Sequence, residues 1–156
     1  MRRISRYLAW LVLILGVVSV AIGIAFIVEA QAKNNYMKDA MRQEQITLGL
    51  DEDAIARGAI VDSGGEAEKA GDTIREHRRG IAATYNELLD GGSFDPTNPT
   101  HVTYMQALNL ENYLYLAVLG FGLTTVVTVS GIFMIIAGLA LAGTGVALRQ
   151  LARRTS

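Results

Sequence analysis

The longest stretch of this sequence without a charged side chain covers residues 112–148. Its 37 residues are mostly apolar, and a helix needs only about 20 apolar residues to cross a bilayer. A second uncharged run covers residues 7–28. Half of the 156 residues are apolar, and they are concentrated in these two runs. This distribution predicts a membrane protein with two spans, and argues against a large soluble core.

The charged residues are distributed unevenly around the two runs. Residues 29–111 hold all fifteen acidic and eight basic residues, a net charge of −7. The other six basic residues are arginines close to the two termini: Arg2, Arg3, Arg6, Arg149, Arg153 and Arg154. Cationic residues beside a span stay in the cytoplasm, whereas acidic residues have little influence on orientation. Both termini are therefore expected in the cytoplasm, and the acidic middle segment outside it.

We accordingly expect an all-α hairpin of two transmembrane helices. The expected segments are a cytoplasmic N-terminus (1–6), the first span (7–28), an extracytoplasmic helical domain (29–112), an overlong second span (113–148) and a cytoplasmic C-terminus (149–156). The first apolar run has 22 residues, which is longer than the roughly 7–15 of a secretory signal. The second run is too short for two crossings. Its excess length predicts either a tilted helix or a bend near residues 143–145.

The outer domain is expected to consist of extensions of both spans plus one inserted helix. Residues 29–45 favour helix, so the first helix should continue to about residue 47, followed by a loop over residues 50–65 with a possible extended piece at 59–61. Ser63 and Glu66 fit a capping box that opens a helix reaching about residue 90. Asn98-Pro99 is a helix start, from which the second long helix should run without a break. The predicted buried face of the inserted helix comprises Ala67, Ala70, Ile74, His77, Ile81, Tyr85 and Leu88.

Small residues recur every seven positions in both apolar runs. Association in lipid depends on close approach of backbones over small residues, and a period of seven suits a left-handed crossing. We interpret these residues as a helix-packing seam, either within a tight hairpin or between chains. Its candidate members are Gly16, Ser19 and Gly23 in the first run, and Gly120, Thr124, Gly131 and Gly138 in the second.

The residues that could perform chemistry are few. The candidates for a metal site are His77, His101 and Glu87. They are weak candidates, because a metal needs three or four converging ligands and the chain has only two histidines and no cysteine. No phosphate loop, nucleophile elbow or nucleic-acid patch is present. A polar pore would have to use the hydroxyl residues Thr124, Thr125, Thr128 and Ser130, which more often bond their own helix backbone. We therefore expect no catalytic site and no cofactor.

Several short motifs give the chain a family resemblance. They are residues 41–47 (MRQEQIT), 70–77 (AGDTIREH), 84–88 (TYNEL) and the segment 107–119. In these the chain resembles a family of uncharacterised two-span membrane proteins common in actinobacteria, some of which carry a ring-opening dioxygenase label. The matching positions include Arg42, Glu44, His77, Tyr85 and Glu87, for which the resemblance implies no role. Two histidines do not supply the iron site that the label requires.

The expected function is structural. The sequence favours a non-enzymatic protein of the bacterial plasma membrane that associates with itself or acts as an accessory subunit of a larger membrane complex. Its partners would be the bilayer and other protein subunits, with no nucleic acid. The alternative is an extracytoplasmic sensor that binds a cation or envelope ligand near His77, Glu87 and His101. A small channel ranks after both.

Overall fold

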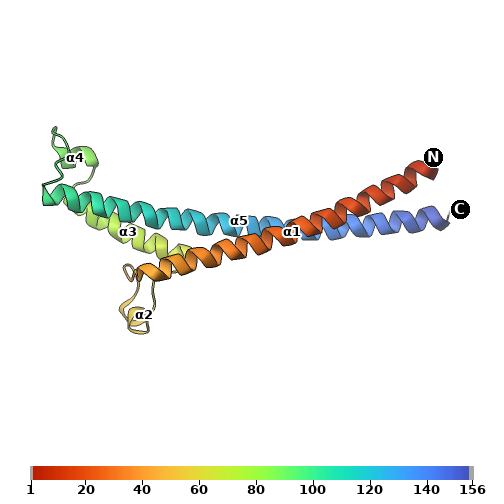
Figure 1. Cartoon of the computed structure of the whole chain (residues 1–156), viewed down its shortest axis with the longest axis horizontal. Helices are drawn as coiled ribbons and strands as arrows, with labels where there is room; N and C mark the ends of the chain where they lie inside the picture. The colour runs from red at the N-terminus through yellow and green to blue at the C-terminus, as the bar shows by residue number, and fades with distance from the viewer. Residues whose placement is uncertain (1, 155–156) are drawn as a thin grey trace. The chain divides into compact units, whose positions relative to one another are not determined.

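The computed structural model describes the backbone of residues 2–154 and the side chains of residues 7–153. The described chain is all-helical, with the order α1 (Arg2–Glu44), α2 (Glu52–Ala56), α3 (Gly64–Ile81), α4 (Tyr85–Leu89) and α5 (Pro99–Arg154) (Figure 1). Both α1 and α5 are long and apolar enough to cross a membrane. The prediction of an all-α chain with two long apolar helices is therefore confirmed.

The chain divides into two compact units. Unit 1 comprises the residues up to Lys33 and those from Thr124 onward, and unit 2 comprises Asn34–Leu123. Each of the two long helices contributes one part to each unit.

Unit 1 is an antiparallel pair of helices. The N-terminal part of α1 packs on the C-terminal part of α5, because Gly16 lies against Gly138 while Gly23 lies against Gly131. The large apolar side chains of both helices point away from this contact, and many are more than half exposed, among them Leu15, Val17, Leu139, Phe133 and Val129. Unit 1 thus buries its small residues and exposes its large ones, the reverse of a soluble helical core.

Unit 2 is built on the antiparallel packing of α3 against the first part of α5. Gly64 lies against Phe121, and seven residues later Gly71 lies against Leu114 and Tyr115. Alanines add to this small-residue face of α3, which lets the two backbones approach. The buried cluster that results consists of Met41, Val61, Ala67, Ala70, Leu114 and Phe121.

The start of α3 confirms the predicted capping box. The Ser63 hydroxyl accepts a hydrogen bond from the Glu66 backbone N–H at 3.3 Å. The Glu66 carboxylate reaches back and accepts from the Asp62 N–H at 3.1 Å and from the Ser63 hydroxyl at 2.8 Å. The carboxylate therefore binds one residue further back than in the usual box, in which it accepts from the cap residue itself.

Loss of this cap should weaken α3. We expect Ser63→Ala to lower the stability of unit 2 by about 1 kcal/mol, because the Glu66 N–H loses its partner and the carboxylate loses one of its donors. Urea denaturation of the solubilised protein, followed by circular dichroism, measures the change. Ser93→Ala, at an exposed position in the loop before α5, is the matched control. Equal stability of the two variants would contradict a capping role for Ser63.

The end of α1 and the following loop differ from the prediction. The helix stops at Glu44, before residue 47, because Gln45 adopts a left-handed backbone with φ of 51°. The Gln45 side chain donates to the Arg42 carbonyl at 2.7 Å and satisfies one of the unpaired carbonyls at the helix end. The predicted loop over residues 50–65 contains the short helix α2. Residues 59–61 form no strand, although the Val61 N–H donates to the Ile46 carbonyl at 2.8 Å.

The prediction of a single inserted helix reaching residue 90 was wrong. Between α1 and α5 the structure has three short helices, α2, α3 and α4. The predicted helix is divided in two, because α3 ends at Ile81 and α4 begins at Tyr85. A second cap causes the break: Thr84 accepts from the Glu87 N–H at 3.2 Å, and the Glu87 carboxylate accepts from the Ala83 N–H at 2.9 Å. A cap residue has an extended backbone, and Thr84 has ψ of 161°, so the helix cannot continue through it.

The start of α5 agrees with the prediction. The Asn98 side chain accepts from the Thr100 N–H at 2.9 Å, and Pro99 is the first helical residue. The helix then continues without interruption to Arg154. The alternative of a bend near residues 143–145 is therefore wrong, and the excess apolar length is helical.

Candidate functional site

The small residues of unit 1 form a continuous contact that we call the glycine seam. Its buried members are Ala9, Gly16, Gly23 and Ala30 from α1, with Gly131, Gly138 and Gly145 from α5. A Cβ atom placed on Gly16 would lie 2.6 Å from the Gly138 carbonyl oxygen, and one placed on Gly23 would lie 2.6 Å from the Gly131 oxygen. These are backbone atoms that no rotamer change can move. The seam therefore requires glycine at these crossings.

Ser19 makes a hydrogen bond across the seam. The Ser19 hydroxyl donates to the Met134 carbonyl oxygen at 2.9 Å. That carbonyl belongs to α5, whereas the hydroxyls of Thr128 and Ser130 donate to carbonyls of their own helix, those of Thr124 and Val126, each at 2.8 Å. Ser19 thus links the two helices, and two of the four hydroxyl residues considered for a pore bond locally.

The Ser19 bond should contribute measurably to helix pairing. Ser19→Ala is expected to weaken unit 1 by about 0.6 kcal/mol, the average found for interhelical hydrogen bonds in membranes. Ser130→Ala is the matched control, because its hydroxyl bonds within α5 and makes no interhelical link. Unfolding in mixed micelles with increasing SDS compares the two. A larger loss for Ser130→Ala than for Ser19→Ala would contradict the assignment.

Of the two remaining seam candidates, Gly120 lies outside unit 1. Gly120 belongs to unit 2, where a Cβ atom would meet the Met37 sulfur at 2.5 Å, the end of a flexible side chain. Thr124 belongs to unit 1 and is half-buried. The structure thus places Gly16, Ser19, Gly23, Gly131 and Gly138 together along one contact, within a single chain.

The three metal candidates are not gathered into one site. His77 is exposed on α3, and the Glu87 carboxylate caps α4 through the Ala83 N–H. His101 lies in the first turn of α5, where its Nδ1 accepts from the Asp95 N–H at 3.0 Å. Among the described residues, no group of three or more His, Asp or Glu side chains could hold a metal ion.

The loop before α5 is organised by Asp95. Its carboxylate accepts from the Thr97 hydroxyl at 2.7 Å and from the Thr97 N–H at 2.8 Å. These two bonds hold the pKa of the Asp95 carboxyl below its usual value, because both favour the charged form. The His101 ring, whose Nδ1 accepts from Asp95, also stacks on Phe94 with 5.7 Å between centroids. His101 therefore has a local structural role.

A buried ion pair lies between α3 and α5 in unit 2. Arg78 Nε donates to Glu111 Oε2 at 2.7 Å, and both residues are less than a tenth exposed. The Arg78 guanidinium also donates to the Tyr104 hydroxyl at 2.5 Å and lies over the Tyr104 ring. Arg75 reaches the second Glu111 oxygen at 3.3 Å. All buried side-chain nitrogen and oxygen atoms that the structure describes have hydrogen-bond partners.

The pair changes the protonation of its cation very little in practice. The hydrogen bond to Glu111 raises the pKa of Arg78, against the opposing effect of burial. Arginine is already charged throughout the physiological range. A pKa raised further keeps the guanidinium of Arg78 charged.

Sequence reasoning missed this pair and misplaced two of its neighbours. His77 and Tyr85 were expected in the core, but His77 is exposed and Tyr85 is 43% exposed. Arg78, the next residue along α3, occupies the inward position. The sequence feature that could have indicated a buried ion pair is Glu111. It is a carboxylate just before an uncharged stretch, with no lysine or arginine between residues 80 and 148.

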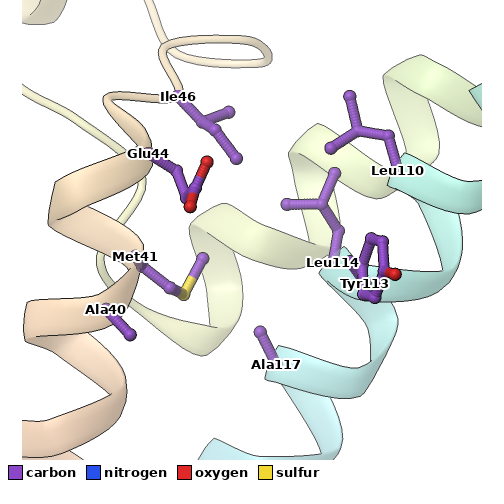
Figure 2. Close-up of a pocket in the computed structure, with 8 residues that line it drawn as sticks. All are labelled: Ala40, Met41, Glu44, Ile46, Leu110, Tyr113, Leu114 and Ala117. Carbon is purple, nitrogen blue, oxygen red and sulfur yellow. The ribbon is translucent and has the colours of Figure 1, made fainter.

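Unit 2 also contains an apolar pocket of about 410 Å³ between the end of α1 and α5 (Figure 2). Its apolar lining consists of Ala40, Met41, Ile46, Leu110, Leu114 and Ala117. Glu44 and Tyr113 complete the lining. Figure 2 shows the Glu44 carboxylate directed toward the space between the two helices. The volume lies within the usual range for small-molecule sites.

Comparison with known proteins adds no assignment. No protein-family model, no curated protein and no solved structure matches this chain.

Proposed function

We propose that this chain is a non-enzymatic integral membrane protein that serves as a scaffold or accessory subunit of a membrane complex. Unit 1 is the membrane anchor, a hairpin of two spans with both termini in the cytoplasm of a bacterium. Unit 2 is the extracytoplasmic part that the anchor presents. The glycine seam is the observation that carries this proposal.

The seam supports an anchor for a physical reason. Burying glycine and alanine while exposing leucine, valine and phenylalanine is unfavourable in water but costs nothing in hydrocarbon. The Ser19 bond and the backbone contacts at Gly16 and Gly138 would hold the two helices together where no hydrophobic effect acts between them. The pair can therefore enter lipid as a preformed hairpin.

The arginines support the orientation. Arg149 lies over the Trp10 ring with 4.5 Å between its guanidinium carbon and the ring centroid. Tryptophan prefers the membrane interface, and a basic residue beside a span prefers the cytoplasmic side. This contact thus supports a cytoplasmic interface at the level of Trp10 and Arg149.

The interior of unit 2 supports a structural role. Its buried polar groups are engaged with each other in the Arg78–Glu111–Tyr104 cluster. Of its two histidines, His77 is exposed and His101 accepts a hydrogen bond from the Asp95 N–H. An accessory subunit needs a stable surface rather than a reactive group. The apolar length of α5 beyond a single span offers further surface for subunit contacts.

The orientation is tested by labelling single cysteines, since the chain has none of its own. Glu68→Cys in unit 2 should react with a membrane-impermeant maleimide in spheroplasts, and Gln150→Cys near the C-terminus only after permeabilisation. Both residues are exposed. Labelling of Gln150→Cys in sealed spheroplasts would contradict the proposed topology.

The scaffold role is tested by mass. Native mass spectrometry of the protein extracted with its surrounding lipid should show an oligomer or a complex with another subunit. Because the glycine seam is occupied within one chain, we expect a Gly143→Leu substitution on the open side of α5 to disturb assembly more than it disturbs the hairpin. A monomer without partners would contradict the scaffold role.

A further inference from the structure

The pocket of unit 2 has the composition of a small-molecule site. Six of its eight lining residues are aliphatic or methionine, and the only charged group among them is the Glu44 carboxylate. A site of this kind typically combines a mainly apolar wall with a few polar groups that orient the ligand. The charge of the pocket therefore depends on Glu44.

Glu44 has no partner within the described part of the chain. The nearby cation Arg42 is engaged elsewhere, because its guanidinium pairs with Asp62 at 2.7 Å and lies 3.9 Å from Asp39. The opposite wall of the pocket belongs to α5, whose residues 99–148 include no lysine or arginine. The acidic residue of that stretch, Glu111, is already paired with Arg78. Among the side chains that the structure describes, residues 7–153, no lysine or arginine pairs with Glu44.

The charge of the surroundings has the same sign. Unit 2 carries fourteen acidic and seven basic residues, a net charge of −7. An acidic unit attracts cations to its surface and repels anions. The Tyr113 ring is a further feature of the lining that suits a cation, since the face of an aromatic ring attracts an ammonium group.

We propose that this pocket binds a small amphiphilic cation, a molecule with an apolar body and one ammonium group. The body would fill the space lined by Met41, Leu110 and Leu114, and the ammonium would pair with Glu44. This binding activity goes beyond the proposed structural function and does not depend on it, because it requires only the fold of unit 2.

The proposal is tested with three probes of nearly equal shape and different charge. They are the 4-phenylbutylammonium ion, 4-phenylbutan-1-ol and 4-phenylbutyrate. Binding to the full chain in nanodiscs is measured by isothermal titration calorimetry, with empty nanodiscs subtracted. We expect the cation to bind about three to ten times more tightly than the alcohol, the range for an accessible charge pair, and the anion to bind most weakly.

Variants of the chain locate the site. Glu44→Gln should bring the cation and the alcohol to equal affinity, whereas Glu68→Gln, an exposed carboxylate on α3 away from the pocket, should leave the preference unchanged. Ala117→Phe should weaken all three probes by filling the pocket. Circular dichroism before each titration shows that the variants are folded.

Several results would overturn the proposal. They are equal binding of the three probes, a cation preference that survives Glu44→Gln, and no binding beyond that of empty nanodiscs. A phospholipid retained by the purified protein and lost in Ala117→Phe would assign the pocket to lipid instead. Failure of the cation to bind leaves the topology and mass tests of the proposed function unaffected, so the two proposals fail separately.

Discussion

Arg78→Ala is expected to destabilise unit 2 by about 3–5 kcal/mol, the cost of breaking a buried ion pair by removing one partner. Glu111 is 7% exposed in the intact protein, and the substitution leaves its carboxylate with only the longer contact from Arg75 to compensate its charge. It also removes the donor that the Tyr104 hydroxyl accepts from. Hydrogen exchange of the α3 backbone amides, measured on the full chain in nanodiscs, gives the free energy of opening.

The matched control is the adjacent residue. His77→Ala should change the same opening free energy by less than about 0.5 kcal/mol, because the histidine is exposed. Joint replacement by Arg78→Leu, Glu111→Leu and Tyr104→Phe should recover part of the loss, since a well-packed apolar cluster can equal a buried pair. A loss in Arg78→Ala no greater than that in His77→Ala would contradict the role of the pair.

Gly138→Leu is expected to separate α1 from α5 in unit 1. Even a Cβ atom at this position would lie 2.7 Å from the Gly16 carbonyl oxygen and 2.9 Å from the Val20 backbone nitrogen. Overpacking typically costs about 1–3 kcal/mol, and contacts with backbone atoms cannot be relieved by side-chain rotation. We therefore expect the free energy of pairing between α1 and α5 to fall by about 3 kcal/mol or more. A loss of this size exceeds the contribution of a typical interhelical hydrogen bond in lipid.

The only tryptophan of the chain reports this separation. Arg149 lies over the Trp10 ring, so loss of helix pairing should change the emission of Trp10 in liposomes. Arg149→Gln establishes the spectrum of the uncovered ring. Gly143→Leu is the matched control on the same helix, because a Cβ atom there meets nothing within 4 Å. Identical emission of Gly138→Leu and the unmodified chain would contradict the seam.

The segments with strong local signals were predictable. The cap at Ser63 and the start of α5 at Pro99 depend on residues within three positions of each other, so the sequence contains all that is needed. The second cap at Thr84 has the same spacing to Glu87 as Ser63 has to Glu66, yet it was missed as a helix break. Apolar periodicity across residues 81–88 concealed it, because a pattern of apolar residues does not reveal where a backbone leaves the helix.

The pocket could not be predicted for a different reason. Its walls come from the end of α1 and from residues 110–117 of α5, which are about seventy residues apart in the chain. The pocket exists because α1 ends at Glu44 in a left-handed turn, and because α3 packs on α5 through small residues. No local pattern encodes the space between two helices.

The sequence by itself determined that the chain is helical, that it contains two long apolar helices, and that small residues repeat along them every seven positions. These properties depend on composition and period, which act locally. Only the tertiary structure decided which face of α3 is buried: Arg78 is buried there, and His77 is exposed. Neighbouring residues on a helix differ by about 100° in direction, so which of the two packs inward depends on the side chains that the opposite helix presents. Here α5 offers the Glu111 carboxylate and the Tyr104 ring, and a guanidinium satisfies both.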